Sequence, residues 1–125
     1  MKKLCATLIA GAALTLGSTP LSAQGYAQSV ASDGQQVFIG ESLNERDPGY
    51  VYIYDRQGSE WVEGTRLQAS DATPGDHFGR ALGRTGDQLL SGATVRNEST
   101  GAVYVFDRAA DGRWVESDSY SSIVE

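Results

Sequence analysis

Cysteine, histidine and lysine are almost absent from this chain of 125 residues. It has one cysteine, Cys5, one histidine, His77, and two lysines, Lys2 and Lys3. Metal sites built from clustered His and Cys side chains are therefore excluded by composition. The longest uncharged apolar run, residues 4–16, is shorter than the roughly 20 residues needed to cross a bilayer. The length allows at most one domain.

The start of the chain has the layout of a secretory signal peptide. Positive residues at positions 2 and 3 precede the apolar run, and Ser18, Thr19 and Pro20 interrupt it before the small residues around Ala23. We therefore expect residues 1–23 to be a signal peptide that is cleaved after Ala23. Export would place the chain in the periplasm or the extracellular space, with no membrane span after processing.

Cleavage would change both the charge and the redox chemistry of the chain. It would remove the only cysteine and both lysines, which leaves eight arginines against sixteen acidic residues, a formal net charge of −8. Without cysteine, stability must come from packing or association rather than from disulfides. The acidity argues against nucleic acid and against anionic membrane surfaces as partners.

Two segments of the chain repeat each other. Residues 26–56 align with residues 78–108 without a gap, and after one inserted residue Trp61-Val62-Glu63 matches Trp114-Val115-Glu116. Internal repetition of this length is typical of stacked repeat folds. The identical pairs in the ungapped part are Gly34/Gly86, Gln36/Gln88, Gly40/Gly92, Gly49/Gly101, Val51/Val103, Tyr52/Tyr104, Asp55/Asp107 and Arg56/Arg108.

Each copy predicts four short strands separated by Gly- and Asp-rich turns. The strands are expected at 26–31, 36–40, 50–55 and 60–68, and again at 78–83, 88–92, 102–107 and 113–120. The fold class is all-β, with two four-stranded antiparallel repeats like propeller blades. The predicted organisation is a signal peptide at 1–23, a first repeat at 24–71 and a second repeat at 72–125.

The second copy resembles the FG-GAP repeat, the blade of integrin α-chain propellers and of short repeats in secreted bacterial proteins. Phe78-Gly79 matches the Phe-Gly pair of the family, and Gly92-Ala93-Thr94 matches its Gly-Ala-Pro triplet except for threonine in place of proline. The first copy has Tyr26-Ala27 and Gly40-Glu41-Ser42 at these places. The resemblance implies a β-propeller blade, and it raises the question of calcium.

Calcium and other cofactors are not expected from the residues present. The loops before the triplet strands, residues 32–35 and 84–87, have one carboxylate each, and loops 41–47 and 94–100 lack a regular alternation of ligands. A calcium ion needs several converging oxygen ligands. We therefore predict no metal site, and interpret Asp71 and Asp76 as caps of the Pro-Gly turn between them.

No catalytic residue is predicted. His77 lies in the connection between the repeats with no evident nucleophile as partner, and is interpreted as a surface loop residue. The repeated pairs Asp55-Arg56 and Asp107-Arg108 are interpreted structurally: the carboxylate accepts turn N–H groups, and the arginine covers the following tryptophan. Alternation places Val51, Ile53, Val103 and Val105 on one face of each strand and the aromatic residues on the other.

Two blades do not close a propeller, which takes about four to eight. We consider three arrangements: self-assembly that completes a ring, a piece of a longer repeat protein, and a small sandwich of two sheets. The predicted function is a secreted, non-catalytic binding module that uses loops 41–48 and 94–100 for a protein or glycan ligand. The alternatives are a hydrolase-type enzyme with an unidentified acidic site, and a remnant repeat without independent function.

Overall fold

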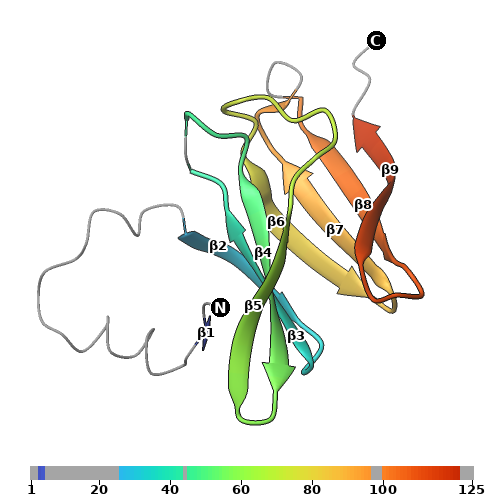
Figure 1. The fold of residues 1–125 in the computed structure, drawn as a ribbon. Helices are drawn as coiled ribbons and strands as arrows, with labels where there is room; N and C mark the ends of the chain where they lie inside the picture. Colours follow the sequence, from blue (N-terminus) through green and yellow to red (C-terminus); the bar gives the residue numbers. More distant parts are fainter. Residues whose placement is uncertain (1–2, 5–25, 44, 97–99, 122–125) are drawn as a thin grey trace, which may run out of the picture.

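The regular elements of the computed structural model are nine β-strands within the residues it describes, which are 3–4, 26–43, 45–96 and 100–121 (Figure 1). They form two antiparallel sheets, ordered β1-β5-β4-β3-β2 and β6-β7-β8-β9. The predicted signal peptide lies outside the described residues except for β1, which pairs with β5. The bounds are β1 Lys3–Leu4, β2 Tyr26–Ser32, β3 Gln36–Glu41, β4 Tyr50–Gln57, β5 Glu60–Leu67, β6 Phe78–Thr85, β7 Gln88–Ala93, β8 Ala102–Arg108 and β9 Trp114–Ser121.

These strands confirm the predicted fold class of two four-stranded antiparallel repeats. Each predicted strand is present, with ends that differ by at most two residues. Within each repeat, successive strands are neighbours in the sheet. The turns form as the sequence indicates: Gly34 has φ +88°, and the side chain of Asp33 accepts the backbone N–H groups of Gln35 and Gln36 at 2.9 and 2.7 Å. Short-range turn chemistry therefore sets the hairpins.

One hydrophobic core fills the space between the two sheets, which Figure 1 shows as two layers side by side. The edge strand β6 of the second sheet lies against β2 and β3 of the first. The buried members of the core are Phe38, Val51, Ile53, Leu67, Ala69, Phe78, Leu89, Ala93, Tyr104, Phe106 and Trp114.

The two repeats contribute opposite faces to this core. Ile53 of the first repeat is buried in it, whereas its repeat-equivalent, Val105, lies on the outer face of the second sheet. Conversely, Tyr104 is in the core and its equivalent, Tyr52, lies on the outer face of the first sheet. The predicted alternation of aliphatic and aromatic faces is thus confirmed, and the repeats pack front to back like successive blades.

A close backbone approach explains the Phe-Gly pair. Gly79 has φ +83°, and a Cβ on Gly40 would lie 2.0 Å from the Gly79 carbonyl oxygen. The Ser29 hydroxyl donates to the same oxygen at 2.7 Å. Ala27, the equivalent of Gly79 in the first repeat, keeps a positive φ of 59°, so the first repeat retains this backbone shape at a cost in strain.

Candidate binding surface at the loop end

Three segments meet at one end of the molecule, at the top of Figure 1: the β3–β4 loop, the β7–β8 loop and the connection 68–77 between the sheets. Gly75 N donates to Asp47 O at 3.1 Å, and Phe78 N donates to Pro48 O at 2.8 Å. On the other side, Val95 N donates to Asp76 O at 3.2 Å. The connection therefore lies between the two loops and is bonded to both. We call these three segments the loop end; residues 44 and 97–99 lie outside the described residues.

Asp76 organises the connection, as predicted for a cap. Its carboxylate accepts the Thr73 backbone N–H at 2.8 Å and the Thr73 hydroxyl at 2.7 Å, and Asp76 itself is buried. Asp71 was expected to cap the same turn, and that prediction is wrong. Its carboxylate instead accepts the Tyr104 hydroxyl at 2.7 Å and an Arg96 N–H at 2.8 Å.

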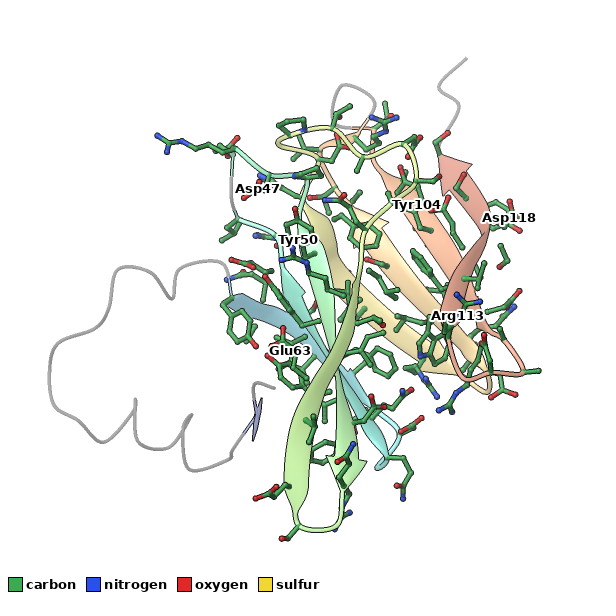
Figure 2. All side chains as sticks on the ribbon, in the orientation of Figure 1. Asp47, Tyr50, Glu63, Tyr104, Arg113 and Asp118 are labelled. Carbon is green, nitrogen blue, oxygen red and sulfur yellow. The ribbon has the colours of Figure 1, made fainter. Side chains whose placement is uncertain are left out.

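Arg96 ties the β7–β8 loop to the connection. Its guanidinium donates to the Thr73 hydroxyl at 3.0 Å and lies 3.4 Å from an Asp76 carboxylate oxygen, in addition to its contact with Asp71. The hydrogen bond from Tyr104 and the charge of Arg96 lower the pKa of Asp71. Burial, followed by the bond to Asp71, raises the pKa of Tyr104 to about 12. Figure 2 shows Asp47 and Tyr104 on the two sides of this loop end.

His77 differs from its predicted place at the surface. The residue adopts a positive φ of 60°, and its side chain is only 15% exposed. Its Nε2 atom lies 3.4 Å from a Glu45 carboxylate oxygen without the geometry of a hydrogen bond. The ring is therefore largely buried and lies close to Glu45 of the β3–β4 loop.

The loop end also presents apolar side chains to solvent. Leu43 in the β3–β4 loop and Val95 in the β7–β8 loop are both exposed. They occupy equivalent positions in the two repeats, 52 residues apart. Loops that connect the strands of a rigid scaffold are where binding residues are most often found. Each predicted binding loop thus presents one aliphatic side chain to solvent at the loop end.

The repeated Asp-Arg pairs have a different partner from the predicted one. The Asp55 carboxylate accepts the Gln36 side-chain amide N–H at 2.7 Å, and the Asp107 carboxylate accepts that of Gln88 at 2.9 Å. Glutamine side chains, rather than the expected turn N–H groups, are therefore the partners of these two carboxylates. The signal was present in the sequence, because both glutamines belong to the identical pairs. The prediction for arginine is confirmed in the second repeat, where the guanidinium of Arg108 lies over the Trp114 ring at 5.7 Å.

Sequence reasoning missed the role of Arg84. Its guanidinium lies 5.0 Å from the centre of the Phe38 ring and 4.7 Å from that of Trp114, and it forms an ion pair with Asp33 at 2.7 Å. Contacts of a cation with aromatic faces at these distances are attractive. Arg84 therefore joins the two sheets at the end opposite the loops, where it has no equivalent, since Ser32 occupies this position in the first repeat.

The described residues contain no candidate metal site. No group of three or more His, Cys, Asp or Glu side chains is gathered there in a way that could hold an ion. The carboxylate of Asp33, in one of the loops considered for calcium, is used by its own turn and by Arg84. Among the same residues, no helix is long and apolar enough to cross a membrane.

A segment of the chain matches the model of a known family. Residues 61–106 match the family model of the FG-GAP repeat. The matched segment runs from β5 of the first sheet to β8 of the second, so it includes the connection 68–77 and the Phe78-Gly79 pair. Comparison with curated proteins finds no match.

Proposed function

We propose, because residues 61–106 match the FG-GAP repeat model, that the chain is an exported interaction module of the β-propeller type, that it binds a protein partner, and that it performs no catalysis. The observation that supports this most is the exposure of Leu43 and Val95 at repeat-equivalent positions of the loop end. Aliphatic side chains suit an apolar patch on a protein better than a sugar, which binds by stacking on aromatic rings.

The loop end is built to hold this surface in place. Arg96 and the backbone bonds of the connection hold residues 47–48 and 95–96 of the two loops, so these residues lose little conformational entropy when a partner binds. The carboxylates of Asp71 and Asp76 are engaged with Arg96, Thr73 and Tyr104. These contacts support a structural role for the acidic residues and a binding role for the exposed aliphatic ones.

The binding proposal is tested with purified extracellular proteins and glycans presented on an array. We expect the wild-type chain to bind a protein, and the double variant Leu43→Ser/Val95→Ser to bind it at least about tenfold more weakly, since a few side chains carry most of the binding energy of such interfaces. Ala110→Ser, at an exposed alanine of the β8–β9 turn at the opposite end of the sheets, is the control. Binding that survives the double substitution would overturn the proposal, and binding to glycans alone would contradict a protein partner.

Export is tested separately. The signal-like layout of residues 1–23 predicts that protein recovered from the periplasm or the medium begins at Gln24. N-terminal sequencing of that material checks the prediction. Recovery of the intact chain from the cytoplasm only, beginning at the first residues, would show that the layout does not act as a signal.

A further inference from the structure

The exposed large apolar residues outside the loop end lie on the outer faces of the two sheets. Val30 pairs with Ile39 and so shares the outer face of the first sheet, and the register of β7, β8 and β9 places the others on the outer face of the second. We call these the tyrosine face (Val30, Val37, Ile39, Tyr52, Tyr54, Trp61) and the valine face (Gln88, Leu90, Val103, Val105, Val115, Tyr120). Figure 2 shows Glu63 and Asp118, which flank these two faces, on opposite sides of the molecule.

The valine face is the second-repeat copy of a face that the first repeat buries. Three equivalent pairs differ sharply in exposure: Val51 (0%) against Val103 (39%), Val62 (7%) against Val115 (51%), and Leu67 (8%) against Tyr120 (61%). Val51 and Leu67 belong to the core between the two sheets, and Val62 is buried as well. The same apolar pattern therefore occurs twice, once with a cover and once open to solvent.

The tyrosine face is, in turn, the first-repeat copy of the covering surface. Phe78 packs edge-on against Tyr104 with ring centres 5.6 Å apart, and in the first repeat Tyr26 packs against Tyr52 at 5.7 Å. Leu82 packs against the core, whereas its equivalent, Val30, is exposed. The molecule therefore exposes apolar residues of the valine face, and on the tyrosine face it exposes Val30, whereas Ile39 and Tyr54 there are buried.

Two surface hollows are lined by equivalent residues of the two repeats, one at the contact between the repeats and one on the valine face. A hollow of about 360 Å³ between the repeats is lined by Gln36, Ile53 and Asp55, with Trp114 in its wall. The equivalent residues of the second repeat line an open hollow of about 460 Å³ on the valine face, bordered by Ser117, Asp118 and Tyr120. In the internal contact, the Trp114 indole N–H donates to the Gln36 side-chain oxygen at 3.2 Å. The equivalent indole is that of Trp61, on the tyrosine face.

We propose that a second copy of this chain docks head to tail, with its tyrosine face on the valine face of the first, so that the contact between the two repeats is continued from chain to chain. In this arrangement Trp61 of the second copy enters the hollow beside Gln88 and donates to its side-chain oxygen. The contact joins two different faces, so it closes into a ring where the rotation between successive copies permits, as it does between the blades of a propeller. With two blades per chain, about two to four copies make a ring of the usual four to eight blades. The proposal does not use the loop end and is independent of the proposed partner.

The test uses the full chain in two variants that block one face each. Val30→Arg places a charge on the tyrosine face and Val115→Asp places one on the valine face, and an unpaired charge in an apolar contact should raise the dissociation constant at least about tenfold. In light scattering, the wild-type chain is expected as an oligomer of two to four copies and each variant as a monomer. Val95→Asp, at an exposed valine of the loop end, is the matched control and should associate like the wild type.

Mixing the two variants decides between head-to-tail and face-to-same-face association. Each variant retains the face that the other has lost, so an equimolar mixture should form a dimer, whereas the double variant Val30→Arg/Val115→Asp should join neither. Recovery of the dimer also shows that both variants are folded. For variants that do not fold, Tyr120→Ser on the valine face and Trp61→Ser on the tyrosine face replace them.

Three outcomes would overturn the proposal. A wild-type chain that remains monomeric at micromolar concentrations would mean that the faces serve another occupant. Association that only one of the two substitutions abolishes would show that one face pairs with itself. A mixture that stays monomeric, although both variants are folded by circular dichroism, would exclude a contact between unlike faces.

Discussion

The indole N–H of Trp114 donates to the side-chain oxygen of Gln36 at 3.2 Å, and this bond joins the last strand of the second sheet to the first sheet. The amide nitrogen of the same glutamine donates to Asp55 at 2.7 Å. Gln36 is buried, and Trp114 packs edge-on against Phe38 with ring centres 5.4 Å apart. One amide thus satisfies two polar groups, one from each repeat, inside the contact between them.

Gln36→Leu should therefore destabilise the chain by about 2 kcal/mol, because it leaves the buried indole N–H and the Asp55 carboxylate without this partner. Gln88→Leu is the matched control, since Gln88 binds Asp107 in the same way on the exposed face. Its cost should stay below about 1 kcal/mol, because water can replace the lost bond. Urea unfolding of both variants checks this, in the chain with Val30→Arg and Val115→Asp so that association does not contribute. Equal losses of stability in the two variants would show that the hydrogen bond from Trp114 to Gln36 does not stabilise the fold.

A second matched pair uses the repeated glycines Gly40 and Gly92. A Cβ on Gly40 would meet the Gly79 carbonyl oxygen at 2.0 Å, whereas a Cβ on Gly92 would meet the Ala81 Cβ at an ordinary 3.5 Å. Gly40→Ala must therefore push β3 and β6 apart, at a cost of about 2–3 kcal/mol. Gly92→Ala should cost less than about 1 kcal/mol. Thermal or urea unfolding in the same association-blocked chain compares them, and a Gly92 variant as unstable as the Gly40 variant would contradict the close approach.

The strands could be predicted from the sequence because their signals are local. The alternation around Tyr52 and Tyr104 and the turn glycines specify each hairpin without information from the rest of the chain. Which face of each sheet is buried could not be predicted, because the two copies have nearly the same pattern and only the placement of one sheet on the other distinguishes them. The contact of Arg96 with Asp71 gives no local signal either, since the two residues belong to different segments and nothing in their spacing relates them.

Removing Arg96 should loosen the loop end. Arg96→Met deletes the contacts with Asp71, Asp76 and Thr73, and we expect a loss of about 1–2 kcal/mol, discounted for the partial exposure of Asp71. Arg113→Met is the control, because its ion pair with Asp111 is solvent-exposed on both sides and should leave stability unchanged.

Hydrogen exchange measured on the amides of the connection 68–77 locates the effect of this change. We expect the amides of the Asp76 turn to exchange faster in Arg96→Met than in the wild-type chain, and to exchange at the wild-type rate in Arg113→Met. Exchange that accelerates uniformly over the chain would instead indicate that Arg96 supports the whole fold rather than the loop end.

Alkaline pH should destabilise the fold through Tyr104. Its pKa is raised from 10.0 to about 12 in the folded chain, chiefly by burial. Because the pKa of Tyr104 is higher in the folded chain than in the unfolded chain, the unfolded chain loses this proton first as the pH rises. Tyr104 therefore makes its full contribution to the free energy of unfolding below pH 10, and this contribution is lost as the pH rises towards 12. The loss from this residue should reach no more than about 2–3 kcal/mol. Tyr52, with a pKa of about 12, should contribute in the same direction.

Tyr104→Phe isolates the contribution of that hydroxyl. The variant loses the bond to Asp71, so it should be about 1 kcal/mol less stable at neutral pH. The stability of the variant should then fall less steeply between pH 10 and 12 than that of the wild-type chain, because residue 104 of the variant releases no proton on unfolding. Tyr120→Phe, which changes an exposed hydroxyl, should retain most of the original slope. Urea unfolding over a series of alkaline pH values measures both slopes. A Tyr104 variant with an undiminished slope would show that the alkaline transition arises elsewhere in the chain.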